Sequence, residues 1–142
     1  MSPVRYLGVD PGKKRIGLAI SDPGGTIATP LKILQRQSLQ QVLADLASLC
    51  RQEEVGTIVV GLPLNMDGTH GPAAQDAEQL ASRLAEATGL AVELWDERLS
   101  SVSAERSMLD ADLSRAMRRR RIDKVAAQII LQGFLDARGR AS

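Results

Sequence analysis

The sequence predicts an α/β fold in which helices flank one mixed sheet of five strands. Two observations lead to this prediction. The first part of the chain alternates apolar and polar residues, as strands do, and the rest alternates short apolar runs with stretches of helical spacing. The 142 residues are enough for a single domain, 1–142, that buries most of its apolar surface without disulfides or a metal.

The first three expected strands follow one another along the chain. Apolar residues are continuous over 6–9, and they alternate with other residues over 15–21. The tripeptide Asp-Pro-Gly follows each of these runs, beginning at Asp10 and at Asp22, and it suits a tight type II turn. A third strand is expected over 26–34. The three strands are therefore expected to be antiparallel neighbours.

The spacing becomes helical after the third strand. Ser38 and Gln41 form a capping-box pattern at the start of the first helix, and Gly89 is expected to end the second. Right-handed crossovers make the fourth and fifth strands parallel to the first, which gives the sheet order 3-2-1-4-5. The expected elements are a helix over 39–50, a strand over 57–61, a helix over 73–88, a strand over 91–95, a short helix over 101–109 and a last helix over 122–137.

The two Asp-Pro-Gly aspartates are expected at opposite edges of this sheet. Asp10 ends the first strand, whereas Asp22 ends the strand that runs back. The carboxyl ends of the fourth and fifth strands meet the edge that holds Asp10, and ligands of open α/β sheets gather there. We therefore expect Asp22 to serve its turn and Asp10 to be functional, with Asn65 and Asp67 in a loop near the site.

Further carboxylates are expected at the edge that holds Asp10. Asp96 and Glu97 end the fifth strand, and adjacent strand residues point to opposite faces, so that only one of them can face Asp10. The residue pattern alone leaves both choices open. Asp123 lies at the start of the last helix, whose apolar composition predicts that it packs on the sheet.

Three carboxylates that meet at one place repel one another, and at least one of them would have a raised pKa. A hard divalent cation such as Mg²⁺ or Mn²⁺ removes this penalty. Two such ions about 3.5–4 Å apart are the usual arrangement for cleaving phosphodiesters. We therefore expect a site with two metal ions.

The net charge is only +1, but basic residues gather over 113–142. This excess suits a polyanion, although a solvated helix face is an equally good interpretation. Aromatic residues make up 2% of the chain, which argues against a platform that stacks single-stranded bases. The candidate nucleic-acid-binding residues are Lys13, Lys14, Arg15, Arg98, Arg118, Arg119, Arg120 and Arg121.

Several other classes of protein are disfavoured. Cys50 is the single cysteine and His70 the single histidine, so neither a disulfide framework nor a Cys/His zinc cluster is expected. The first glycine-rich turn lacks the Gly-Lys-Ser/Thr of a Walker loop. No apolar run reaches the length of a membrane span, and the N-terminus lacks the layout of a signal peptide. A cytoplasmic location is therefore expected.

Four blocks of the sequence resemble the YqgF/RuvX family, whose members are described as Holliday junction resolvases or pre-16S rRNA nucleases. The blocks are GVDPGKKRIGLAISD, VVGLPLNMDGT, DERLSS and RIDKVAAQIILQGFLD, and the resemblance covers 6–137. It implies a ribonuclease H-like fold and a metal-dependent nuclease that acts in 5′-end maturation of pre-16S rRNA. It also implies that Asp10, Glu97 and Asp123 are the catalytic and metal-binding acids.

The resemblance leaves alternatives open. Junction resolvases of this fold usually carry a further acid three residues after the helix acid, where this chain has Ala126. That difference favours a structured RNA precursor over branched DNA, with ribosomal particles as further partners and either a monomer or a homodimer. A non-catalytic RNA- or polymerase-binding factor is another alternative. The first block is also similar to the phosphate-binding hairpin of actin-like ATPases and sugar kinases, which need a second domain to enclose ATP.

Overall fold

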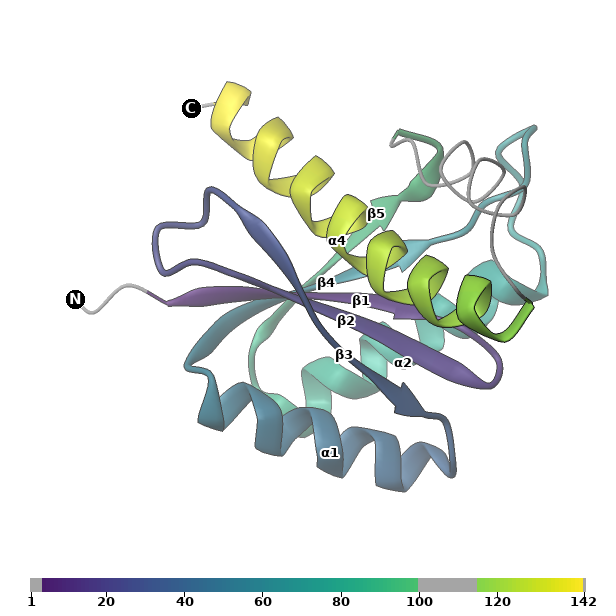
Figure 1. Ribbon diagram of the computed structural model, residues 1–142, viewed down its shortest axis with the longest axis horizontal. Helices are drawn as coiled ribbons and strands as arrows, with labels where there is room; N and C mark the ends of the chain where they lie inside the picture. Colours follow the sequence, from purple (N-terminus) through teal and green to yellow (C-terminus); the bar gives the residue numbers. More distant parts are fainter. Residues whose placement is uncertain (1–3, 100–114, 142) are drawn as a thin grey trace.

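The structure of the protein is a computed structural model that describes residues 4–99 and 115–141, with the side chains of 115–124 and 140–141 outside the description. Strands and helices alternate along the chain after an initial run of three strands (Figure 1). The elements are β1 (Arg5–Pro11), β2 (Arg15–Ser21), β3 (Ala28–Gln35), α1 (Leu39–Gln52), β4 (Val55–Leu62), α2 (Pro72–Thr88), β5 (Ala91–Asp96), the 3-10 turn η1 (Glu97–Leu99) and α4 (Arg115–Ala141).

The five strands form one sheet in the order β3-β2-β1-β4-β5. β2 pairs antiparallel with β1 and β3, whereas β4 runs parallel to β1 and β5 runs parallel to β4. The mixed sheet and its strand order, both predicted from the sequence, are confirmed. Helix α4 crosses one face of the sheet, and α1 and α2 cover the other (Figure 1).

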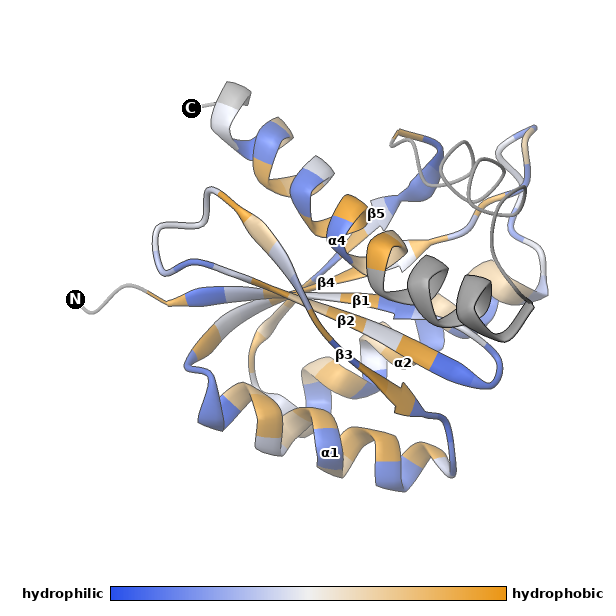
Figure 2. Ribbon diagram, in the orientation of Figure 1, coloured by the Kyte–Doolittle hydropathy of each residue, from blue (hydrophilic) through white to orange (hydrophobic). Residues whose placement is uncertain are grey.

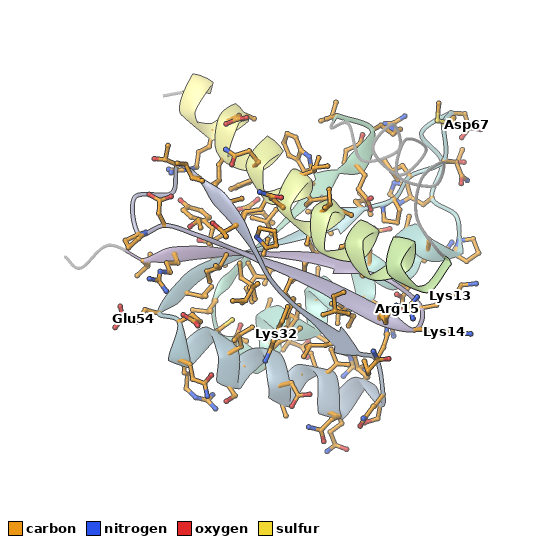
Figure 3. The ribbon with its side chains drawn as sticks, viewed as in Figure 1. Lys13, Lys14, Arg15, Lys32, Glu54 and Asp67 are labelled. Atoms are coloured by element: carbon orange, nitrogen blue, oxygen red, sulfur yellow. The ribbon has the colours of Figure 1, made fainter. Side chains whose placement is uncertain are left out.

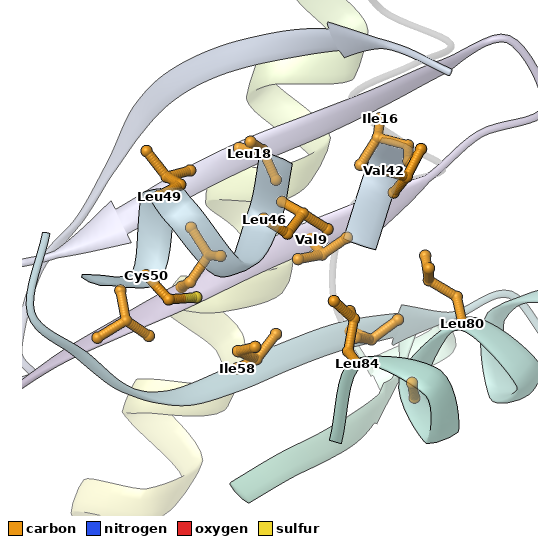
Figure 4. Close-up of a cluster of buried hydrophobic side chains, with 14 of the residues drawn as sticks. Val9, Ile16, Leu18, Val42, Leu46, Leu49, Cys50, Ile58, Leu80 and Leu84 are labelled. Carbon is orange, nitrogen blue, oxygen red and sulfur yellow. The ribbon is translucent and has the colours of Figure 1, made fainter. Parts of the chain in front are cut away.

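Two apolar clusters hold these layers together. The larger one lies between the sheet and the pair α1 and α2, and it includes Leu7, Val9, Leu46 and Leu84 (Figure 4). The smaller one lies under α4 and includes Ile130. In Figure 2, apolar positions run along the strands and along the faces of α1 and α2 that meet them. The central strands β1, β2 and β4 are thus buried on both faces, which explains their nearly continuous apolar runs.

The two Asp-Pro-Gly segments differ from the type II turns expected for them. The first is not a turn at all, because β1 continues through Pro11. The second is a turn, in which the N–H of Gly25 donates to the carbonyl of Asp22 at 3.0 Å. A type II turn needs a positive φ at its third residue, Gly24, but the positive φ of 69° lies one residue later at Gly25. The type II prediction is therefore wrong for both copies.

Helix ends also differ in part from expectation. Ser38 caps α1 by accepting from the N–H of Gln41 at 3.1 Å, but the Gln41 side chain donates to Asp45, so the reciprocal half of the capping box is not made. Gly89 ends α2 in the left-handed conformation, as predicted. Helix α4 begins at Arg115, so the basic segment before residue 122 is helical. The short helix predicted over 101–109 lies outside the described residues.

Within residues 4–99 and 115–141, no helix is both long enough and apolar enough to cross a membrane.

Candidate active site

Asp10 lies in β1 on the face of the sheet that α4 covers. Leu7 and Val9 belong to the cluster under α1 and α2, so the alternation of the strand turns Gly8 and Asp10 to the other face. A Cβ atom on Gly8 would lie 2.7 Å from Cβ of Leu131 in α4, which confirms that Gly8 faces α4. Asp10 is only 6% exposed. Its carboxylate is therefore held between the sheet and the helix layer.

The Glu97 carboxylate lies over β4 on the face of the sheet that α4 covers. The parallel register of β1 and β4 pairs Val9 with Val60, and its extension by one residue would set Asp10 opposite Gly61. A Cβ atom on Gly61 would lie 3.2 Å from Oε2 of Glu97 and 2.6 Å from Cδ1 of Ile130 in α4. The Glu97 carboxylate consequently lies over Gly61, on the same face as Asp10. Gly61 leaves the space that this carboxylate uses.

Asp96 is engaged elsewhere. Its Oδ2 accepts from Nη2 of Arg98 at 2.8 Å, and its Oδ1 accepts from the backbone N–H of Arg98 at 2.9 Å. The side-chain hydrogen bond from Arg98 lowers the pKa of Asp96 below its usual range. Of the two adjacent acids that the residue pattern could not separate, Glu97 lies on the face of the sheet that carries Asp10, and Asp96 pairs with Arg98.

Arg98 is one of the residues predicted to bind nucleic acid, and its N–H groups form hydrogen bonds within the protein. Besides Asp96, it reaches the carbonyl of Met66 at 3.5 Å. Its hydrogen bond to Asp96 raises the pKa of Arg98 above its usual value. Arg98 therefore connects the end of β5 to the loop that follows β4.

Asn65 and Asp67, predicted to lie near the site, build this loop. Oδ1 of Asp67 accepts from the hydroxyl of Thr69 at 2.6 Å and from its backbone N–H at 3.0 Å, and Asn65 donates to the same hydroxyl at 2.8 Å. The Thr69 hydroxyl lowers the pKa of Asp67, which keeps this carboxylate charged. The hydrogen bonds of both residues give the loop its shape.

Basic residues lie at the same end of the molecule. Lys13 and Lys14 are exposed at the tip of the β1–β2 hairpin, and Arg15 is half-buried beside them. Figure 3 shows the three residues near the first turns of α4 and at the end of the molecule that carries Asp67. Four further arginines that were predicted to bind nucleic acid belong to the helical backbone of α4, but their side chains lie outside the described residues: Arg118, Arg119, Arg120 and Arg121.

Asp123 is also a residue of α4 whose side chain lies outside the description. The helix runs antiparallel to β1, because Arg138 approaches Gly25 at one end of the sheet while Ala127 and Leu131 pack on Gly8. The turns before Ala127 therefore lead toward the carboxyl end of β1. Among the described side chains, no group of three or more His, Cys, Asp or Glu residues could hold a metal ion.

Asp22 has the role in its turn that the sequence predicted. Its carboxylate accepts from the backbone N–H groups of Gly24, Thr26 and Ile27 at 3.2, 2.8 and 2.7 Å. The bond from Ile27, followed by that from Thr26, lowers the pKa of Asp22. This aspartate stabilises the β2–β3 connection at the opposite edge of the sheet from Asp10.

Sequence reasoning missed one pair near the site. Nη1 of Arg36 donates to the carbonyl of Gly12 at 2.9 Å, and the same guanidinium forms a two-bond ion pair with Asp76 at 2.8 and 2.9 Å. Arg36 follows β3 and Asp76 lies in α2, 40 residues further along the chain. No local pattern marks either residue, because only the fold brings them together.

Comparisons with known proteins identify a family and a shared fold. The model of the RuvX family, described as a Holliday junction resolvase, matches residues 4–137. A protein of Myxococcus xanthus strain DK1622, named "Putative pre-16S rRNA nuclease", is 52% identical over 134 residues, or 94% of this chain and 89% of that protein. A protein with the same name from Syntrophomonas wolfei is 53% identical over 133 residues, or 94% of each chain.

The fold is also shared with a solved structure. The chain titled "T. thermophilus RuvC in complex with Holliday junction substrate" aligns over 96% of both chains with a TM-score of 0.59 and 14% sequence identity. This likeness confirms the ribonuclease H-like fold that the resemblance implied.

Proposed function

This chain belongs to the RuvX family, and on that basis we propose that it is a metal-dependent nuclease that hydrolyses phosphodiester bonds in a structured RNA, at the 5′ end of pre-16S rRNA. The observation that carries the proposal is that Asp10 and the Glu97 carboxylate lie on the same face of the sheet, the one that α4 covers. Relatives that share about half of their residues with this chain bear the name of a pre-16S rRNA nuclease. That function would place the protein in the cytoplasm.

The donor set suits a divalent cation. Carboxylate oxygens are the ligands that Mg²⁺ and Mn²⁺ prefer, and Asp10 is 6% exposed next to a second carboxylate. Asp123, in the turn of α4 before Ala127, would be the third ligand. Bound at these three acids, one or two ions would supply Lewis-acid activation of a phosphodiester and a nucleophilic water at neutral pH.

The protein's own groups have separate tasks in this proposal. Asp10 and Glu97 would supply negative charge on one face of the sheet, Asp10 from the central strand β1 and Glu97 from η1, which follows the edge strand β5. Lys13 and Lys14 provide exposed ammonium groups at the same edge, where they attract the phosphate backbone. The basic turns of α4 around Arg118–Arg121 would extend that attraction along the substrate.

Cleavage of a four-way DNA junction is the second candidate, because the family model carries that description. The structure gives one observation against it. Ala126, at the position where the resemblance would place a further acid, is 2% exposed within the apolar cluster under α4. A junction resolvase must also cut two strands symmetrically, which requires a dimer.

A side-by-side cleavage assay tests the proposal. A 5′-extended pre-16S rRNA fragment and a four-way DNA junction are each incubated with the parent protein and with Asp10→Asn, in Mg²⁺, in Mn²⁺ and in chelator. We expect the parent to cut the RNA only with metal and Asp10→Asn to lose most of that cleavage. Preferential cutting of the junction would support the second candidate. Metal-independent RNA binding without cleavage would favour a non-catalytic binding factor.

A further inference from the structure

The hairpin loop that carries Lys13 and Lys14 is held on both sides by one residue. The backbone N–H of Arg36 donates to the carbonyl of Lys14 at 2.8 Å, and its Nη1 donates to the carbonyl of Gly12 at 2.9 Å. Within the loop, the N–H of Gly12 donates to the carbonyl of Arg15 at 3.0 Å. The two bonds from Arg36 thus bracket Lys13, three residues after Asp10.

Arg36 is itself fixed by Asp76. Its two terminal nitrogens contact the two oxygens of Asp76 at 2.8 and 2.9 Å, a geometry that restrains the guanidinium plane. The Arg36 side chain is 16% exposed, against 41% for Asp76. Asp76 lies in α2 next to Ala77, a member of the main apolar cluster. A rigid helix therefore anchors the hairpin through Arg36.

We propose that Arg36, oriented by Asp76, is a positioning residue that presents Lys13 and Lys14 to the phosphate backbone of the substrate. This inference rests on the proposed nuclease function and names the part of the chain that aligns its substrate. A loop that is ordered before binding does not lose its conformational entropy on binding, so the same two lysines bind more tightly. The loop follows Asp10 directly, so its position also sets where the bound backbone lies relative to that carboxylate.

Asp76→Asn is the decisive variant, because electrostatics and positioning predict opposite signs. Removing a negative charge lessens the repulsion of a polyanion, so charge alone would strengthen RNA binding. The Asn side chain keeps one acceptor oxygen, but an amide NH2 group replaces the second oxygen. Because this group donates and cannot accept from the guanidinium, the two-bond pair is disrupted. We expect the dissociation constant for the 5′-extended pre-16S rRNA fragment in chelator to rise by about 3- to 10-fold.

Glu53→Gln is the matched control. Glu53 accepts from Arg5 at 2.9 Å in an ion pair near the amino-terminal end of β1, away from the hairpin, and its loss removes the same charge. We expect this variant to bind RNA as tightly as the parent or more tightly. Circular dichroism and thermal melting show whether each variant is folded. If Asp76→Asn is unfolded, Arg36→Lys repeats the test, because Lys keeps the positive charge but cannot form the two-bond pair.

A double-mutant cycle separates positioning from a general structural effect. Lys13→Gln with Lys14→Gln should weaken binding less in the Asp76→Asn background than in the parent, because misplaced lysines contribute less. Additive losses, or RNA binding by Asp76→Asn as tight as that of the parent, would overturn the inference while leaving the nuclease proposal intact. A parent protein that neither binds nor cleaves the RNA would overturn the proposed function and this inference with it.

Discussion

Oε2 of Glu97 lies 3.2 Å from the point where a Cβ atom on Gly61 would stand. The parallel register pairs Val9 with Val60, and its extension by one residue would set Gly61 opposite Asp10, so this glycine leaves room for the Glu97 carboxylate on the face that carries Asp10. The added methyl group of Gly61→Ala would also come within 2.6 Å of Cδ1 of Ile130. A side chain at position 61 would therefore press on both Ile130 and the Glu97 carboxylate.

We predict that Gly61→Ala lowers metal-dependent cleavage, by less than the roughly 100-fold that a misplacement of about 1 Å can cost, because the Glu97 carboxylate must shift only slightly to make room. The free energy of unfolding should fall by only about 1–3 kcal/mol, since the end of the Ile130 side chain can turn aside. Single-turnover cleavage and thermal melting measure the two effects. Gly139→Ala, where a Cβ atom would meet nothing within 4 Å, is the control and should keep full activity.

The second prediction concerns the acids as one assembly. Asp10→Asn alone should abolish most cleavage, and adding Asp123→Asn should cost little more, because residues that act as a unit have non-additive effects. Glu97→Gln should be as inactive as Asp10→Asn. Single-turnover cleavage of the rRNA fragment at a fixed Mn²⁺ concentration measures each effect.

Asp96→Asn is the matched control for Glu97→Gln, because it changes the adjacent carboxylate that Arg98 already holds. It should retain substantial activity. Equal inactivation of Asp96→Asn and Glu97→Gln would contradict the assignment of Glu97 to the site. Parent-like cleavage by Asp10→Asn would instead argue for a binding factor.

Much of this site follows from the sequence because the strand pattern determines the sheet order, and the sheet order places Asp10 and Asp22 at opposite edges. The residue pattern alone left Asp96 and Glu97 open, and the resemblance to the family implied Glu97. Trp95 packs in the cluster under α4, so alternation along the chain turns Asp96 to the other face and brings Glu97 back to the face that carries Asp10. The face that Trp95 takes depends on its contact with Gly133 of α4, which the residue pattern of the strand does not reveal.

Two other features could not be predicted, one because it depends on a distant contact and one because local preference allowed two conformations. Arg36 and Asp76 are 40 residues apart, and neither stands in a recognisable motif. The type of the second turn depended on which of two adjacent glycines, Gly24 or Gly25, takes the positive φ. Both glycines tolerate that conformation, so local preference did not distinguish them.

The third prediction concerns metal binding. If Asp10 belongs to a metal site, Mn²⁺ or Mg²⁺ should raise the melting temperature of the parent by mass action on the folded state. Asp10→Asn should reduce this shift. Asp22→Asn should preserve it, although its starting melting temperature is lower because Asp22 holds three backbone N–H groups. Differential scanning fluorimetry over a metal titration measures the shifts, and equal responses of the two variants would remove the case for a site at the edge with Asp10.

The fourth prediction concerns acid stability. The pKa of Asp22 is lower in the folded protein than in the unfolded chain, chiefly because of the hydrogen bond from Ile27. Its contribution to the free energy of unfolding is therefore complete above the unfolded value of about 3.9 and is lost as the pH falls through the lower folded value. Asp22→Asn should be less stable than the parent near neutral pH, and the gap should narrow below about pH 4. Urea unfolding across this pH range measures the gap, and a constant difference would show that the charge of Asp22 does not contribute.

The fifth prediction concerns the basic turns of α4. Replacing Arg118, Arg119, Arg120 and Arg121 with Gln should weaken RNA binding and flatten its salt dependence by about 0.7–0.9 log units for each phosphate that is no longer neutralised, because fewer counterions are released. The control Arg5→Gln with Arg51→Gln removes basic residues near the opposite edge of the sheet and should leave the slope unchanged. Titrations of RNA binding at several salt concentrations in chelator measure the slope. A quadruple variant with the slope of the parent would mean that these arginines face away from the substrate, and the hairpin lysines would then account for the binding of phosphates at the site.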